Sequence, residues 1–153
     1  MANTYSQISI QVVFAVKGRE NIIIQKFRDE LHKYIAGIVN DNKQKSLAVN
    51  GSTDHLHVFF GLEPSMCISD LVRDIKAGSS KWINERGFIK GKFNWQDGYA
   101  AFSYSKSQRD SVIKYIMNQE QHHRKKSFRE EYLEMLRKAG IKFESQYLFE
   151  FYD

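Results

Sequence analysis

The chain has 153 residues, of which 42% are hydrophobic, 27% charged and 14% aromatic. This balance excludes a disordered chain, and the length fits a single domain over residues 1–153 with a core of its own. The net charge of +5 favours a polyanionic partner such as a nucleic acid, but a solvated basic surface explains it equally well.

Cys67 is the single cysteine. This count excludes an internal disulfide and a zinc site made of thiolates, and it fits a reducing compartment. No run of residues approaches the ~18 apolar positions of a membrane span. The first residues, "MANTYSQISI", lack the charged start and the apolar block of a signal peptide. We therefore expect a cytoplasmic protein without a membrane partner.

The first half of the chain predicts a strand, a helix and two further strands. In "ISIQVVFAV", apolar residues alternate from Ile8 to Val16, which is typical of a strand. Apolar residues then recur at helical spacing over residues 21–39. The segments "SLAV" and "HLHVFFGL" indicate two strands joined around the turn-rich stretch "NGSTD".

The next segments complete a recognisable order of elements. A helix is expected from about Ser69, and "NWQDGYAAFSYS" predicts a fourth strand. The order strand–helix–strand–strand–helix–strand predicts a ferredoxin-like α+β fold. We expect an antiparallel sheet with helices packed on one face and additional C-terminal helices.

Two C-terminal helices have clear boundary signals. "SQRD", from Ser107 to Asp110, has the capping-box pattern and opens a helix that we expect to run to about His123. A further helix is predicted for residues 127–138, closed by Gly140 as its C-terminal cap.

Two histidines, His55 and His57, lie one residue apart at the start of a predicted strand. Side chains at i and i+2 of a strand point the same way, so both imidazoles share one face while Leu56 and Val58 face the core. Two imidazoles can bind a divalent metal, but an isolated pair is weak evidence. Histidines that simply pack in the core are an alternative at this point.

Tyr115, Gln119 and His122 share one narrow face of the helix predicted from Ser107. A half-buried tyrosine with polar neighbours is the simpler explanation of this face. Beside the histidine pair, however, the same face would offer a nucleophile and a further metal ligand.

These motifs resemble those of the single-tyrosine HUH transposases of small bacterial insertion sequences, the TnpA type. His55-Leu56-His57 is the HUH motif, and "YIMNQ" places Tyr115 and Gln119 where this family has its nucleophile and its glutamine metal ligand. Four longer segments are similar to family segments in family order: "VVFAVKGR", "SDLVRDIKAGSSKWIN", "WQDGYAAFSYS" and "NQEQHHRKKSFREEYLEML". Gln11 is a departure, since many members carry a histidine there. Because it lies outside the motifs, this departure puts little of the resemblance in doubt.

The resemblance implies a DNA transposase that cleaves and rejoins single-stranded DNA at element ends. His55, His57 and Gln119 would hold magnesium or manganese against the scissile phosphate. Tyr115 would attack the phosphate, which gives a 5′-phosphotyrosine and a free 3′-hydroxyl. The covalent bond preserves the energy of the phosphodiester, so strands can be rejoined without ATP. His122 is a candidate helper, with a plain polar surface residue as the simpler explanation.

The resemblance also implies a homodimer that acts on hairpin-ended single-stranded DNA in the bacterial cytoplasm. The tyrosine helix is exchanged between subunits in many members, and the polar segment "YSKSQRD" would serve as the hinge. Cations that bind phosphates, and a ring that stacks on bases, are the candidate DNA contacts: Arg73, Lys76, Lys81, Arg86, Lys90, Lys92 and Trp95. A solvated face, or core packing for the ring, explains these residues nearly as well.

Three other functions stay open at the level of sequence. They are an HUH endonuclease of the replication-initiator or relaxase type, a domesticated relative that processes palindromes, and a non-catalytic nucleic-acid-binding module. The small size of the chain argues against the first. The joint presence of both histidines, Tyr115 and Gln119 argues against the last, because binding alone needs none of them.

Overall fold

The fold is an α+β sandwich built on one antiparallel sheet. The computed structural model describes residues 3–18, 23–123 and 125–152, without the side chain of His122. The strands are β1 (Ser9–Ala15), β2 (Lys45–Gly51), β3 (His55–Gly61) and β4 (Ala100–Tyr104), in the spatial order β2-β3-β1-β4. This is the predicted ferredoxin-like arrangement. Within the described ranges, no helix has the length and apolar character that crossing a bilayer requires.

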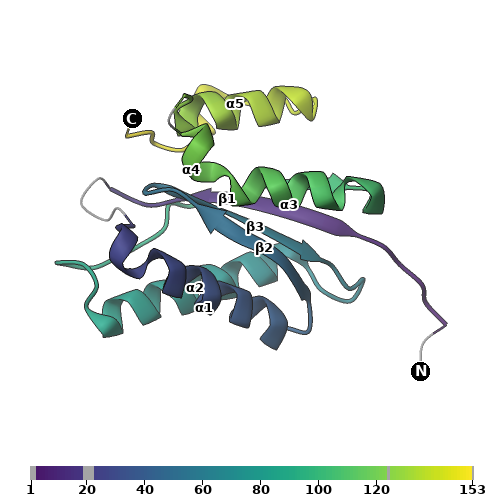
Figure 1. Cartoon of the computed structure of the whole chain (residues 1–153), viewed down its shortest axis with the longest axis horizontal. Coiled ribbons are helices and arrows are strands. Elements are labelled where there is room, and N and C mark those ends of the chain that lie inside the picture. Colours follow the sequence, from purple (N-terminus) through teal and green to yellow (C-terminus); the bar gives the residue numbers. More distant parts are fainter. Residues whose placement is uncertain (1–2, 19–22, 124, 153) are drawn as a thin grey trace.

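Helices cover both faces of the sheet (Figure 1). The helices α1 (Gln25–Asp41) and α2 (Ile68–Arg86) lie on one face. On the other face lie α3 (Arg109–Met117), the short α4 (Gln119–His122) and α5 (Phe128–Lys138). The predicted C-terminal additions therefore form a second helical layer, and the space between this layer and the sheet holds the site described below.

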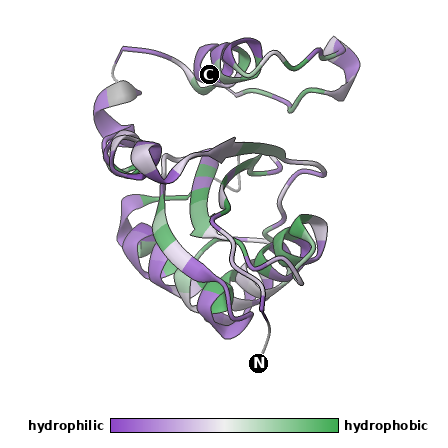
Figure 2. Ribbon diagram, turned by 90° about the vertical axis from the view of Figure 1, so that its right-hand side faces the viewer, coloured by the Kyte–Doolittle hydropathy of each residue, from purple (hydrophilic) through white to green (hydrophobic). Residues whose placement is uncertain are grey.

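The two central strands are buried on both sides. Every residue of β1 is buried, and so are the first six residues of β3. In β3, Leu56, Val58 and Phe60 join the main core, whereas Phe59 belongs to a second cluster with Val112 and Ile116 of α3. Figure 2 shows the hydrophobic residues along the strands and hydrophilic residues on the outer sides of the helices. Alternation along β3 thus separates the core face from the histidine face, as predicted.

The helix predicted from Ser107 to His123 is not one helix. Its first turn is a 3-10 turn over Lys106–Gln108, whose capping box is formed by Ser105 and Gln108 instead of Ser107 and Asp110. At Asn118 the backbone leaves helical angles (φ −98°, ψ 21°), and α4 begins after it. The amide of Asn118 donates to the carbonyls of both Lys114 and Tyr115 at 3.2 Å, a shared bond typical of a helix end.

The predicted boundaries of α5 are confirmed. The Ser127 hydroxyl caps the helix by accepting from the amide of Glu130 at 3.1 Å. Gly140 (φ 69°) ends it, and the following Ile141 amide donates to the carbonyl of Leu136. The aromatic tail docks on this helix through contacts of Phe149 and Phe151 with the rings of Phe128 and Tyr132.

The turn before the histidines requires a glycine. Gly51 pairs with Leu56 at the end of the β2–β3 hairpin. A Cβ atom at Gly51 would lie 2.1 Å from the carbonyl oxygen of His55 and 2.9 Å from the Cα of Leu56, both backbone atoms. Gly51 therefore allows the close approach of chains that places His55 at the start of β3.

Candidate active site

His55 and His57 point from β3 into the layer of α3, α4 and α5, and neither side chain is exposed to solvent. Their ring centroids are 5.1 Å apart. The ring of Phe128, the first residue of α5, stacks on the ring of His55 at 3.9 Å with an angle of 3°. The pair is thus buried, but on the face opposite the main core, which agrees with the direction predicted from strand alternation.

The outer nitrogen of each ring is held by a polar partner. His55 Nδ1 lies 2.8 Å from Oδ1 of Asp54, the residue before it. His57 Nδ1 donates to Oε1 of Gln11 at 2.6 Å, and the Gln11 amide in turn donates to the hydroxyl of Tyr104. Such partners fix the tautomer and leave Nε2 to face the site. Gln11 therefore contributes directly to the site, although it lies outside the family's motifs.

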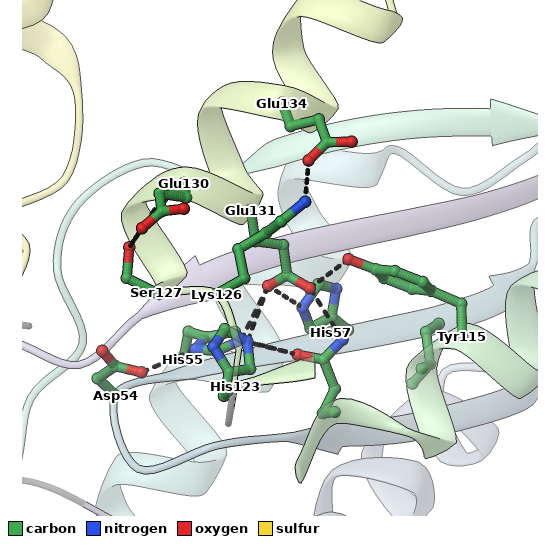
Figure 3. Close-up of polar contacts among 12 residues, drawn as sticks. Asp54, His55, His57, Tyr115, His123, Lys126, Ser127, Glu130, Glu131 and Glu134 are labelled. Atoms are coloured by element: carbon green, nitrogen blue, oxygen red, sulfur yellow. Dashed lines mark hydrogen bonds and ion pairs between the residues drawn. The ribbon is translucent and has the colours of Figure 1, made fainter. Parts of the chain in front are cut away.

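Glu131, on the first turn of α5, lies at the centre of the site (Figure 3). Its Oε1 lies 3.3 Å from Nε2 of His55, 3.3 Å from Nε2 of His57 and 3.1 Å from Nε2 of His123. The residue is 3% exposed. Two histidines of β3 and one histidine beyond α4 therefore meet at one carboxylate, although 74 positions separate His57 from Glu131 in the chain.

Gln119 and His123 complete the cluster. Gln119 is fully buried, and its Oε1 lies 3.0 Å from His55 Nε2 and 3.1 Å from His123 Nε2. Its amide nitrogen donates to Oε2 of Glu131 at 3.0 Å. The amide oxygen thus faces the histidines, as a metal ligand would. The side chain of His122, the predicted helper, lies outside the described part of the chain.

Tyr115 reaches the same cluster from α3. Its hydroxyl donates a short hydrogen bond to Oε2 of Glu131, and its ring centroid lies 6.1 Å from that of His57. The predicted nucleophile therefore lies in the site of its own chain. Asn50 of β2 holds α3 against the sheet, because its side-chain amide donates to the backbone carbonyl of Ile116 at 2.9 Å.

The charges in the cluster are mutually stabilised. Burial alone would raise the pKa of Glu131, but hydrogen bonds from His123 and His55 lower that pKa well below its usual range. Burial also tends to lower the pKa of His55, yet its contacts with Asp54 and Glu131 raise it from 6.5 to about 9. Burial lowers the pKa of His57. Without a metal, Glu131 is therefore a carboxylate and His55 an imidazolium at neutral pH.

The same environment opposes ionisation of Tyr115. Burial and the nearby Glu131 carboxylate raise the pKa of its hydroxyl far above 10. A tyrosinate beside an unneutralised carboxylate is thus strongly disfavoured, and positive charge in the cluster would reduce this cost.

The donor set fits a divalent cation. His55, His57 and Glu131 offer ligand atoms that all lie within 4.8 Å of one another. Two ligand atoms that bind one ion at about 2.1 Å each, at right angles, lie about 3.0 Å from each other. The observed distances are similar: His55 Nε2 lies 3.0 Å from Gln119 Oε1 and 3.3 Å from Glu131 Oε1. In neutral His57, moreover, Nδ1 carries the proton, so the Nε2 lone pair faces Glu131 Oε1 across 3.3 Å. A cation would satisfy both acceptors.

The residues predicted to contact DNA lie on the other side of the sheet, on α2 and the segment that follows it. Trp95 is 7% exposed and packs its ring on Phe14 and Phe93, as in the core-packing explanation. Lys76 donates to the carbonyls of Gln96 and Gly98. Three other cations take part in ion pairs with carboxylates: Arg73 with Asp70 and Asp74, Lys81 with Glu85, and Arg86 with Glu30.

Sequence reasoning missed Glu131, His123 and Gln11. Glu131 follows a serine cap in the first helical turn, where acidic residues are common because they stabilise the helix dipole. That local explanation hides its role. Gln11 carries a detectable signal, since a polar residue in the middle of an otherwise apolar strand needs a buried partner.

Comparisons with known proteins show the family of this chain and agree with its fold. The family described as "Transposase IS200 like" matches residues 4–119. The ISDra2 transposase TnpA of Deinococcus radiodurans is 22% identical over 118 residues, which cover 74% of this chain and 84% of that protein. The match to the family extends over most of the chain and includes both histidines, Tyr115 and Gln119. The protein therefore belongs to the family of IS200-like transposases.

Two solved structures share the fold. A crystal structure of a transposase from Deinococcus radiodurans superposes with a TM-score of 0.62 at 22% identity, over 78% of this chain and 95% of that one. A REP-associated tyrosine transposase bound to a REP hairpin superposes with a TM-score of 0.58 at 15% identity, over 80% of this chain and 73% of that one. Both likenesses confirm the α+β fold predicted from the sequence.

Proposed function

We propose that this transposase cleaves and rejoins single-stranded DNA through a 5′-phosphotyrosine on Tyr115. The observation that carries the proposal is the meeting of Tyr115 and the histidine pair at the Glu131 carboxylate. A nucleophile and a cation-binding donor set a few ångströms apart are what phosphoryl transfer requires, because the reaction depends on positioning and charge neutralisation.

The residues of the site have distinct parts in this chemistry. His55, His57 and Gln119 are the proposed ligands of magnesium or manganese, with Glu131 as a further ligand. Bound there, the cation would act as a Lewis acid towards the phosphate and offset the charge of Glu131. Asp54 and Gln11 orient the two imidazoles from outside.

Tyr115 is positioned by Glu131. The carboxylate holds the hydroxyl in the site through its hydrogen bond, which limits the rotation of the side chain. Attack on the scissile phosphorus forms the phosphotyrosine bond and releases the 3′-hydroxyl of the preceding nucleotide. A 3′-hydroxyl that later attacks the phosphotyrosine restores a phosphodiester and frees the tyrosine, so no net energy source is needed.

DNA hairpins at the element ends are the proposed partners. The solved relative bound to a REP hairpin is a protein of the same fold, which supports this proposal. The homodimer stays a prediction. Because Tyr115 reaches the histidines of its own chain, we propose that each subunit carries a complete site in this conformation.

A covalent-adduct assay tests the proposed function. Single-stranded DNA from the element ends, labelled at the 3′ end, is incubated with the protein and magnesium, and SDS-resistant adducts are resolved on a gel. We expect an adduct with the unmodified protein and none with Tyr115→Phe. Tyr147→Phe is the matched control, because this tyrosine is 81% exposed and lines neither the cluster nor the cavity beside it. An adduct that persists in Tyr115→Phe would refute the assignment of the nucleophile.

A further inference from the structure

A cavity of about 770 Å³ lies between α3 and α5, directly beside the cluster described above. Tyr115 and Glu131 line it, and Gln11 and Tyr104 of the sheet line it as well. Its volume falls in the range of small-molecule binding sites, about 300–1,000 Å³. The cavity therefore offers room for a ligand that touches the tyrosine.

The lining suits a nucleobase. Val112 and Met135 provide apolar surface from the two helices, and Gln108 and Gln121 provide amides that can both donate and accept hydrogen bonds. Unpaired bases are bound by such mixtures of apolar contact and polar edges.

The rim of the cavity carries a pair of lysines that already hold an anion. Lys126 and Lys138 both form ion pairs with the carboxylate of Glu134, the second at 2.8 Å. All three residues line the cavity, and their side chains are between 40% and 76% exposed. Two ammonium groups that converge on two carboxylate oxygens can converge in the same way on the two free oxygens of a phosphodiester.

We propose that this cavity binds the nucleotide next to the scissile phosphate. Lys126 and Lys138 then bind a neighbouring phosphodiester, which replaces the carboxylate of Glu134 as their partner. The inference rests on the proposed function, because it takes Tyr115 as the point of cleavage. The wall formed by α5 lies after residue 119, where the match to the family ends. This part of the substrate site is therefore supplied by residues outside the family match.

Glu134 competes with DNA for the two lysines. Substitution of Glu134 and substitution of a lysine should therefore change the affinity for DNA in opposite directions. Glu134→Gln removes the competing anion and should tighten the binding of a single strand severalfold. Lys138→Glu should weaken binding severalfold and reduce the salt dependence of log K by about 0.7, the value for one phosphate contact on single-stranded DNA. The matched controls are Glu130→Gln and Arg137→Glu, which make the same charge changes on α5 at residues that do not line the cavity.

The binding of a fluorescein-labelled oligothymidylate of 15 nucleotides is measured by fluorescence anisotropy. All proteins are full-length and also carry Tyr115→Phe, so that the DNA is not cleaved during the titration. Photocrosslinking is the second measurement, with benzoylphenylalanine placed at Met135 inside the cavity or at Arg137 outside it. We expect Glu134→Gln to bind more tightly than Glu130→Gln, Lys138→Glu to bind more weakly than Arg137→Glu, and crosslinks only from position 135.

Equal effects within each matched pair, or crosslinks from position 137 alone, would overturn the proposal. The outcome is independent of the covalent-adduct assay. An adduct without the binding pattern would show that the chemistry is correct and the cavity is not the binding site. The binding pattern without an adduct would support the cavity while refuting the proposed cleavage.

Discussion

The hydroxyl of Tyr115 donates a hydrogen bond to the carboxylate of Glu131, a residue 16 positions further along the chain on a different helix. The other oxygen of that carboxylate faces the two histidines of β3. Glu131 is thus the physical link between the proposed nucleophile and the proposed metal ligands.

Glu131→Ala should weaken the binding of manganese by at least about tenfold, because a negatively charged ligand is lost from the donor set. Isothermal titration calorimetry with manganese chloride measures the effect without reference to activity. Glu130→Gln is the control, since its carboxylate lies on the same turn and contacts Ser127 instead of the cluster. An unchanged dissociation constant for Glu131→Ala would show that Glu131 is not a ligand.

The stability of the metal-free protein should fall between pH 6.5 and 9. Contacts with Asp54 and Glu131 outweigh burial and raise the pKa of His55 from 6.5 to about 9, so its protonation stabilises the folded state. This contribution is complete below about pH 6.5 and is lost as the pH rises through about 9. Urea unfolding with EDTA at three pH values measures the free energy of unfolding.

Asp54→Asn should reduce this loss of stability, because it removes the carboxylate partner of His55 Nδ1. Asp74→Asn, on the exposed side of α2, should leave the pH dependence as it is in the unmodified protein. A free energy of unfolding that stays constant or rises from pH 6.5 to 9 would contradict the assignment.

Gly51→Ala should destabilise the protein by at least about 2 kcal/mol, because its Cβ would collide with backbone atoms of His55 and Leu56 that cannot move independently of β3. Gly37→Ala makes the same chemical change within α1, where a Cβ meets no atom within 4 Å. It should stabilise the protein by about 0.5–1 kcal/mol through helix propensity. Urea unfolding of both variants measures the change in the free energy of unfolding, which should have opposite signs in the two. Equal changes would contradict the close approach of chains at Gly51.

Mixing Tyr115→Phe protein with His57→Ala protein should not restore adduct formation. Each variant lacks one part of the site, and in this structure Tyr115 lies in the site of its own chain, 6.1 Å from His57 between ring centroids. The adduct assay on the mixture, after unfolding and refolding together to allow subunit exchange, gives the answer. Recovery of adduct would show that the tyrosine helix is exchanged between subunits.

Features that depend on residues close together in the chain were predictable from local sequence patterns. Alternation in β1 and β3 predicted the strands, and the i, i+2 rule placed His55 and His57 on one face. The serine cap and Gly140 predicted the limits of α5. The four-residue spacing of Tyr115 and Gln119 brought both towards the histidines, even though Asn118 breaks the helix between them.

The residues that complete the site from distant parts of the chain could not be identified without the packing of the layers. Glu131 reaches the histidines because Phe128 stacks on His55 and the aromatic tail packs on α5, contacts that no local pattern encodes. The same packing separates α2 and its predicted DNA-contacting cations from Tyr115, since the sheet lies between them. Periodicity reports which face of an element is apolar, whereas the partner of a buried polar group is chosen by how the layers pack.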